Sequence, residues 1–362
     1  KKMVRNKCRN AIVETSSEGI KQFRHRFINY DILVFTGLYP EHIESHGSFE
    51  KYKAAKGRLF AHLKGCKAKY VDENKFVQGA ASGLKKTDFY IVKKTIIANL
   101  DDENAPYFLD FWAEEKIGYG DKTKNKKNRK TGVELNNLAE FNDIEATQSG
   151  VSFKIGNVKI HLQLLGAFNV ANAMNAVCVG LSQGLDLEKI KLALERIKGI
   201  AGRAERIDEG QPFAVVVDYA FEPNAVARLY ESVKLIPHNK IIHVLGSAGG
   251  GRDVARRPIL GKLAGENADL VIITNEDPYN DDPAIIIEQV AAGAEYAGKI
   301  DKKNLFKIMD RREAIEKAIG FAEKNDIVLI TGKGSEQAIC VADGEKISWD
   351  DRAVARGILN SR

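Results

Sequence analysis

The sequence predicts an α/β protein whose C-terminal half is a doubly wound parallel sheet. Between residues 213 and 331, short apolar segments rich in Val, Ile and Leu alternate with amphipathic helical segments. The apolar segments show little polar alternation, which is typical of parallel strands covered by helices on both faces. Because strand and helix alternate repeatedly, right-handed crossovers and a parallel sheet are expected.

Five strands and four helices are expected in this half. The strands are 213–217, 240–245, 270–274, 305–309 and 327–331, and the helices are 223–236, 254–265, 283–297 and 311–323. A polar stretch containing Gly, Asp, Asn or Arg follows each strand. Since the carboxyl ends of parallel strands meet at one edge of an open sheet, these stretches predict a crevice for a small charged ligand. Each stretch alone is also an ordinary turn.

The first half of the chain is less regular. Strands are predicted at 11–14 and 31–35, helices at 17–27, 48–63 and 169–183, and shorter strands and loops at 66–165. The composition changes at Gly199-Ile200-Ala201-Gly202, which predicts a hinge and two domains, 1–201 and 202–362. Because an apolar, strand-like segment begins so close to residue 1, the chain is expected to be a fragment of a longer protein.

Composition excludes several classes of protein. With 362 residues, two domains of ordinary size are expected. No apolar run approaches the roughly 20 residues that cross a bilayer, so membrane insertion is not expected. The four cysteines lie far apart in the sequence, which disfavours a disulfide scaffold or a zinc site and favours the reducing cytoplasm.

The net charge of +6 has a local origin. Basic residues gather at Lys116, Lys122, Lys124, Lys126, Lys127, Arg129 and Lys130. This stretch is either a surface that binds polyanions or a solvated loop. No stacking aromatic residues are interleaved with it, which favours the loop, and nucleic acid is not an expected partner.

Several residues before position 60 have chemistry that the local pattern leaves open. Glu14 ends a predicted strand and could hold a hard cation, or the turn that follows could simply cap a helix at Ser17. His42 and His46 flank Glu44 and could bind a metal, although Pro40 and Gly47 indicate a loop. Lys56 lies in an amphipathic segment and has the pattern of a surface lysine.

The glycine-rich stretches are individually unspecific. Gly246 to Arg252 is not a G-x-G-x-x-G fingerprint, and Gly332 to Ser335 lacks the upstream glycine of a P-loop. No G-x-x-x-x-G-K-[ST] motif occurs in the chain.

Taken together, a dozen short motifs in one order resemble the Mur ligases, most closely the tripeptide synthetases of that family. The motifs are Glu14-Thr15-Ser16-Ser17, Phe35 to His42, His46-Gly47, Tyr52, Ala55-Lys56, Gly166 to Asn172, Gly202 to Glu205, Val217 to Ala220, Arg252-Asp253, Arg257-Pro258, Asn275 to Pro278 and Gly332 to Gly334. The resemblance extends from residue 14 to about residue 352. It implies a central ATPase domain without its P-loop at 1–201 and a Rossmann-like C-terminal domain at 202–362.

The resemblance implies an ATP-dependent ligase of peptidoglycan precursor synthesis. ATP would phosphorylate the glutamate side chain of UDP-N-acetylmuramoyl-L-alanyl-D-glutamate, and an amino acid would attack the acyl phosphate. Such chemistry depends mainly on positioning and on neutralising phosphate charge.

The resemblance also implies a role for each matching residue. Glu14, His42 and a carbamylated Lys56 would hold Mg²⁺, since a carbamate supplies the hard oxygen ligands that this ion prefers. Ser16, Gln22 and Arg24 would contact the UDP-muramoyl dipeptide. Asn169, Asn172, Arg203 and Asp218 would bind ATP, with Arg203 also offsetting phosphoryl charge. The pocket for the amino acid would consist of Arg252, Glu276, Asp277, Pro278, Tyr279, Gly332 and Glu336.

Three features depart from the family pattern. The P-loop is missing, so the chain alone is expected to be inactive. Phe221-Glu222 replace the usual His-Thr, and Ser335 replaces a common His. Tyr279 replaces the arginine that grips the distal carboxylate of meso-diaminopimelate, and a tyrosine cannot form that bidentate pair. L-lysine or another diamino acid is therefore the expected substrate.

Three alternatives remain at this stage. A folylpolyglutamate-type ligase of the same superfamily is disfavoured by Ser16, Gln22 and Arg24. A non-catalytic binding protein is favoured by the missing P-loop and disfavoured by the joint presence of Glu14, His42 and Lys56. A nicotinamide-dependent oxidoreductase rests only on the α/β pattern. In each case we expect a monomer.

Overall fold

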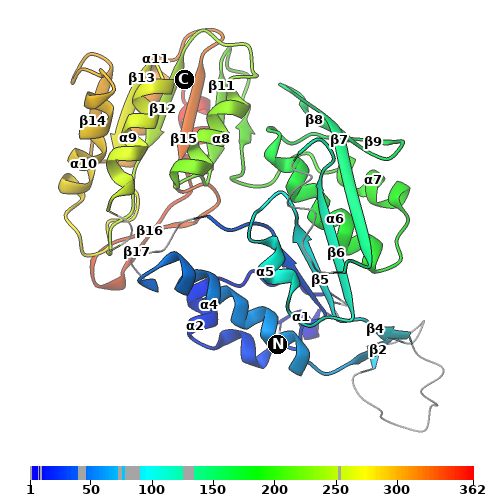
Figure 1. Cartoon of the computed structure of the whole chain (residues 1–362). Helices are drawn as coiled ribbons and strands as arrows, with labels where there is room; N and C mark the ends of the chain where they lie inside the picture. The colour runs from blue at the N-terminus through cyan, green and yellow to red at the C-terminus, as the bar shows by residue number, and fades with distance from the viewer. Residues whose placement is uncertain are drawn as a thin grey trace. The chain divides into compact units, whose positions relative to one another are not determined.

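The computed structural model describes residues 2–6, 8, 10–39, 46–71, 76–77, 90–124, 134–251 and 254–362 (Figure 1). Contacts between residues divide the chain into two compact units. The first consists of 1–143, 154–159 and 171–191, and the second of 144–153, 160–170 and 192–362. Both contain helices and parallel strands, which confirms the predicted α/β class.

The N-terminal sheet is built on four parallel neighbours. These are β1 (Ile32–Phe35), β5 (Thr95–Asn99), β6 (Glu115–Asp121) and β7 (Asn137–Thr147), and β8 (Gly150–Ile155) and β9 (Val158–Leu162) follow in the strand order. The core of the first unit gathers apolar residues from β1, β5 and the helix α4 (Phe49–His62). Phe35 stacks on Phe108 with ring centroids 4.1 Å apart.

The other elements before residue 200 are short helices, a small sheet and two longer helices. They are α1 (Lys2–Arg5), α2 (Ser17–Lys21), η1 (Arg24–Phe27), η2 (Leu63–Gly65), β2 (Lys69–Val71), β3 (Phe76–Val77), β4 (Tyr90–Val92), α5 (Ala105–Leu109), α6 (Phe168–Ser182) and α7 (Leu187–Glu195). Helices α4 and α6 confirm the predictions for 48–63 and 169–183.

Two predictions for the N-terminal region are wrong. Residues 11–14 form no strand, because the segment is exposed and pairs with none of the described strands; Ile12 is fully accessible. The helix predicted over 17–27 is interrupted, because Phe23 adopts a left-handed backbone conformation with φ of 61°. That conformation ends α2, and a separate turn of 3₁₀ helix follows it.

The sheet of the second unit has the strand order β10-β11-β15-β12-β13-β14. Its strands are β10 (Glu205–Ile207), β11 (Ala214–Asp218), β12 (Ile241–Leu245), β13 (Leu270–Thr274), β14 (Leu305–Ile308) and β15 (Ile327–Thr331). All pairs are parallel except β10 with β11. The five predicted strands are therefore confirmed to within one residue.

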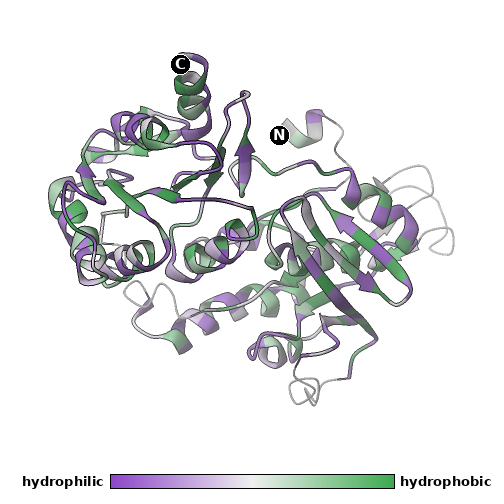
Figure 2. Ribbon diagram, turned by 90° about the horizontal axis from the view of Figure 1, so that it is seen from above, coloured by the Kyte–Doolittle hydropathy of each residue, from purple (hydrophilic) through white to green (hydrophobic). Residues whose placement is uncertain are grey.

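Helices cover both faces of this sheet. Helices α8 (Pro223–Val233), α9 (Arg256–Asn267) and α10 (Pro283–Tyr296) pack on one face, and α11 (Arg311–Phe321) and α12 (Asp351–Asn360) pack on the other (Figure 1). Figure 2 shows the strands between them as largely hydrophobic. This arrangement confirms the doubly wound prediction. The remaining elements are β16 (Ala338–Cys340), η4 (Ala342–Gly344) and β17 (Lys346–Ser348).

A buried ion pair joins two strand ends to the last helix. Arg311 is 2% exposed and donates from Nε and Nη2 to the carboxylate of Asp351, at 2.8 and 2.7 Å. The same guanidinium donates to the carbonyl of Asn275, after β13, and to that of Thr331, at the end of β15. The indole of Trp349 also donates to Asp351 at 2.8 Å. The carboxyl ends of β13 and β15 are thus fixed by one cation.

The structure also bears on two predicted absences. All four cysteines are free in this structure. Within the described ranges, no helix has both the length and the apolar character needed to cross a bilayer.

Asp351→Ala is expected to lower the free energy of unfolding by about 3–5 kcal/mol, because it leaves the buried guanidinium of Arg311 without its counter-charge. Urea denaturation followed by circular dichroism measures the change. Glu323→Gln, which breaks an exposed pair with Lys240, is the matched control and is expected to unfold at the wild-type urea concentration. Equal effects of the two substitutions would contradict the structural role of the buried pair.

Candidate functional site

Polar residues that follow three strands of the second sheet meet at its carboxyl edge. Lys333 follows β15, Asp277 follows β13, and Tyr219 follows β11. Side-chain contacts join all three segments into a single cluster of polar side chains. The crevice for a small charged ligand at this edge stays a prediction.

Lys333 lies at the centre of the cluster. Its side chain is fully buried, and its ammonium donates to Asp277 Oδ1 at 2.8 Å and to Glu336 Oε2 at 2.5 Å. Burial alone would lower the pKa of Lys333, but the two carboxylates outweigh it and raise the pKa. Asp277 Oδ1 also accepts from the backbone of Cys340. One buried cation therefore holds two predicted amino-acid ligands in place.

Tyr219 connects this cluster to Arg203. The hydroxyl of Tyr219 donates to Glu336 Oε1 at 3.0 Å, so both carboxylate oxygens of Glu336 have a partner. The guanidinium of Arg203 lies 4.7 Å from the centroid of the Tyr219 ring. Burial, followed by the charge of Glu336, raises the pKa of Tyr219, which keeps the hydroxyl a donor.

A glycine contact fixes the loop that carries Arg203. Gly202 has φ of 63°, and a Cβ at this position would lie 2.1 Å from the backbone nitrogen of Ser335. Only glycine fits such a close approach of two backbones. The structure thus places a predicted ATP ligand and a predicted amino-acid ligand on segments that touch each other.

Asp218 has a structural role at the end of β11. Its carboxylate accepts from the backbone N–H groups of Ala204 and Ala220, both at 2.6 Å. Burial raises the pKa of Asp218, although these two hydrogen bonds oppose the shift. The carboxylate therefore holds the Arg203 loop against the strand, and its contact with ATP stays a prediction.

Glu276 is the buried acid of the site. It is 4% exposed, and burial raises its pKa to about 7 in spite of the nearby guanidinium groups of Arg311 and Arg256. Its Oε2 has no hydrogen-bond partner among the described residues. A Cβ on Gly332, which has φ of 105°, would lie 2.2 Å from this oxygen. Glycine at 332 is thus required for Glu276 to occupy its place.

The residues predicted to contact the UDP-muramoyl dipeptide surround α2 in the first unit. Ser16 caps this helix, and its Oγ accepts from the backbone of Gly19 at 3.1 Å. Gln22 is the C-terminal cap, and the Arg24 side chain lies close to Gly19. The N-cap is thus Ser16 and not Ser17, whose buried hydroxyl instead contacts the ring of His46 at 3.1 Å.

Lys56 lies beside the same region, on α4. Its ammonium is 5.1 Å from the centroid of the Tyr52 ring, and the ring of His46 lies 5.3 Å from that of Tyr52. Burial lowers the pKa of His46, and although Glu18 opposes this shift, the charges of Lys21, Lys56 and Arg58 add to it. His46 therefore links the start of α2 to the part of α4 that carries Lys56.

The structure places only some of the remaining predicted site residues. His42 and Arg252 lie outside the described residues. Glu14 is exposed, Asn169 donates to the carbonyl of Leu165, and Asn172 is exposed on α6. Pro278 is buried, and Tyr279 has a positive φ of 50°. In the part of the chain that the structure describes, no group of three His, Cys, Asp or Glu residues gathers in a way that could hold a metal.

Three residues that organise the site were not predicted from the sequence. They are Lys333, Tyr219 and Arg311. Lys333 and Tyr219 lie in motifs that the resemblance includes, but Lys333 is 56 residues from Asp277 and Tyr219 is 117 residues from Glu336. One local signal could have identified Lys333. It lies between two glycines directly after an apolar strand, where a charged side chain is unexpected and needs acidic partners.

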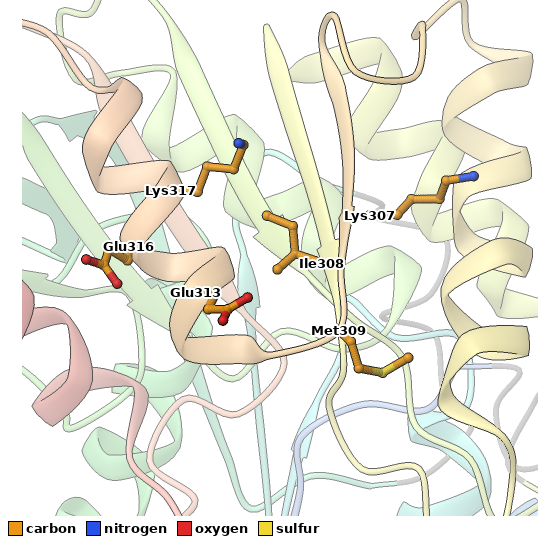
Figure 3. A pocket seen from close by; sticks show the side chains of 6 residues that line it. All are labelled: Lys307, Ile308, Met309, Glu313, Glu316 and Lys317. Carbon is orange, nitrogen blue, oxygen red and sulfur yellow. The ribbon is translucent and has the colours of Figure 1, made fainter.

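A separate hollow of about 570 Å³ contains none of the predicted site residues (Figure 3). Its lining residues are Lys307, Ile308, Met309, Glu313, Glu316 and Lys317, from β14, α11 and the turn between them. Lys307 already pairs with Glu288 at 2.9 Å. The hollow is an open, charged surface, and the candidate site is the cluster around Lys333.

Comparison with known proteins identifies both parts of the chain. Residues 1–92 and 82–180 match the family model described as the Mur ligase middle domain, and residues 202–334 match that described as the Mur ligase, glutamate ligase domain. The chain is 37% identical over 360 residues to the UDP-N-acetylmuramyl-tripeptide synthetase of a Roseiflexus species, covering 97% of this chain and 65% of that protein.

Further relatives and solved structures agree. The UDP-N-acetylmuramoyl-L-alanyl-D-glutamate–2,6-diaminopimelate ligase of Geobacillus kaustophilus is 33% identical, with 100% of this chain and 67% of that protein covered. A solved structure of a ligase with that name superposes with a TM-score of 0.54 at 26% identity, covering 96% of this chain and 64% of the other. Folylpolyglutamate synthase of Mycobacterium tuberculosis shares the fold, with a TM-score of 0.56 at 14% identity. The chain spans about two thirds of the length of the curated relatives it matches.

Glu276→Gln is expected to change how stability depends on pH. In the wild type the pKa rises from 4.5 to about 7 on folding, so the folded state binds the proton more tightly, and stability falls as pH rises between these values. The free energy of unfolding of the variant minus that of the wild type should therefore increase by about 3 kcal/mol from pH 4.5 to pH 7.5. Urea denaturation at a series of pH values measures this difference. Glu188→Gln, at an exposed position, serves as control, and a flat difference for Glu276→Gln would refute the shift.

Proposed function

Because the chain belongs to the Mur ligase family, we propose that it serves in an ATP-dependent ligase that adds the third amino acid to UDP-N-acetylmuramoyl-L-alanyl-D-glutamate. Relatives at 30–37% identity carry names for this activity. The observation that supports the proposal most directly is the continuous set of contacts from Arg203 through Tyr219 and Glu336 to Lys333 and Asp277. It connects the residues expected at the nucleotide with those expected at the amino acid.

The reaction we propose has two steps. The γ-phosphoryl group of ATP moves to the side-chain carboxylate of the glutamate, which forms an acyl phosphate and ADP. The amino group of the incoming amino acid then attacks the carbonyl carbon, loses a proton, and releases phosphate from the tetrahedral intermediate. Arg203 is exposed and is held over Tyr219, a position from which its charge can offset that of a phosphoryl group.

We propose that Mg²⁺ is held in the first unit by Glu14, His42 and a carbamate on Lys56. Glu14 is exposed. Lys56 and His46 both contact the ring of Tyr52, close to the start of α2. A carboxylate and a carbamate offer the hard oxygen ligands that fit this ion. When bound, the ion would neutralise negative charge on the phosphate oxygens.

The charge balance of the amino-acid pocket supports a cationic substrate side chain. Asp277 and Glu336 share a single cation, Lys333, and Glu276 lies nearby as a further acid. Among these four side chains, three are acids and one is a cation. Tyr279 stands where the resemblance predicts an arginine for meso-diaminopimelate. We propose L-lysine or another diamino acid with a free side-chain ammonium as the substrate.

The 362 residues alone are expected to form no ligated product, because no G-x-x-x-x-G-K-[ST] motif occurs among them to bind the β- and γ-phosphates. The assay combines MgATP, UDP-N-acetylmuramoyl-L-alanyl-D-glutamate and a panel of amino acids, and follows phosphate release and product mass. The complete open reading frame that contains these residues is assayed in parallel and is expected to be active. Product from the 362 residues alone would refute the need for that motif, and no product from either would refute the proposed reaction.

In the complete protein, kcat/KM for L-lysine or L-ornithine is expected to exceed that for meso-diaminopimelate. Tyr279→Arg should shift this ratio at least tenfold toward meso-diaminopimelate, because it supplies a planar cation for the distal carboxylate. Tyr296→Arg, at a position that is 81% exposed, is the matched control. A wild-type preference for meso-diaminopimelate would overturn the assignment of the substrate.

A further inference from the structure

Arg256 has a buried guanidinium in which only one nitrogen atom has a described hydrogen-bond partner. It begins α9, is 5% exposed, and donates from Nη1 to Glu222 Oε1 at 2.7 Å. Its Nε and Nη2 have no hydrogen-bond partner among the residues that the structure describes. Leaving a charged donor buried without an acceptor is costly, so these two atoms indicate a group that completes the site.

Two other arginines show what this edge of the guanidinium binds. Arg311 uses Nε and Nη2 to grip Asp351, at 2.8 and 2.7 Å. Arg352 uses the same two atoms to grip Asp350, at 2.9 and 2.6 Å. In both pairs a planar fork meets the two oxygens of one carboxylate. Arg256 offers the same pair of donors, with the spacing that suits a carboxylate or a phosphoryl group.

Contacts place this edge within the candidate site. The guanidinium of Arg256 lies 5.3 Å from the centroid of the Phe221 ring, and that ring lies 5.0 Å from the ring of Tyr219, which contacts Arg203 and Glu336. The positive charge of Arg256 also acts on Glu276. Arg256 is therefore part of the same polar cluster as the predicted ligands.

One feature of the helix favours an anion at this place. The first turn of α9 contains no acidic residue of its own, so the positive end of the helix dipole adds to the charge of Arg256. The loop after β12 contacts the start of this helix, since Arg257 donates to the carbonyl of Ala248, and the buried hydroxyl of Ser247 in that loop has no partner among the described residues. Glu222 orients Arg256 through Nη1 alone and so leaves its bidentate edge available.

We propose that Arg256 is an oxyanion-binding residue of this site, which takes a carboxylate or phosphoryl group of a substrate between Nε and Nη2. The inference rests on the proposed function for the identity of that substrate, an amino acid or ATP. It also explains two departures from the family pattern. Phe221 and Glu222, which replace the usual His-Thr, are the two residues that stack on Arg256 and orient it.

The arginine side chains can be observed directly in the chain labelled with ¹⁵N-arginine. The Nε–H resonance of Arg256 is assigned by its loss in Arg256→Lys, and the resonance of Arg311 serves as an internal reference because that group is already bonded. Inorganic phosphate, MgATP and L-lysine are titrated separately. We expect the Arg256 resonance to move downfield with at least one of them while that of Arg311 stays in place. Movement with phosphate and MgATP identifies a phosphoryl ligand, and movement with L-lysine alone identifies a carboxylate.

The affinity of the ligand that moves the resonance is then measured by calorimetry. Arg256→Gln and Arg256→Lys should each weaken binding at least tenfold, since neither keeps the fork, whereas Arg206→Lys, at an exposed position on β10, should not. If the Arg256 resonance moves with none of the three probes, the inference is overturned. If it moves with phosphate while MgATP and L-lysine leave the whole spectrum unchanged, and neither binds the complete protein by calorimetry, Arg256 is an oxyanion site and the proposed function fails instead.

Discussion

The buried pair of Arg311 and Asp351 is the interaction on which the second unit most depends. A guanidinium in the interior must have every donor satisfied, and here the acceptors are a carboxylate from α12 and two main-chain carbonyls at the ends of β13 and β15. The segments that carry Glu276, Asp277 and Lys333 begin directly after those carbonyls. The Arg311–Asp351 pair therefore helps to position these three side chains, although none of them belongs to the pair.

The buried charges near the Arg311–Asp351 pair are compensated in a similar way. Buried cations here are paired with acidic groups: Lys333 joins Asp277 to Glu336, and Arg256 donates to Glu222. Burial raises the pKa of Glu276 to about 7, and its Oε2 has no hydrogen-bond partner among the described residues.

The sequence predicted the second sheet well and the polar contacts poorly, for one physical reason. Strands such as β12 and β15 are buried on both faces, so their apolar runs are a local property that the sequence displays directly. Lys333 has one local partner, Glu336, but Asp277 lies 56 residues from it, and Tyr219 lies 117 residues from Glu336, so no local pattern contains these contacts. The prediction of a strand at 11–14 is wrong for a related reason: a strand also needs a distant partner, and none of the described strands pairs with this segment. Ser16 is an intermediate case: the sequence predicts a helix cap in that turn at Ser17, whereas the structure has the cap at Ser16.

The place of Asp351 in the chain has a consequence for synthesis. Translation proceeds from the N-terminus, and domains fold as they emerge. Arg311 and all the strands of the second sheet leave the ribosome before Asp351 does, so the nascent sheet holds an uncompensated cation during that interval. The counter-charge of Arg311 becomes available only when α12 has been made. We therefore expect the apolar core of the sheet to form before its carboxyl edge is fixed.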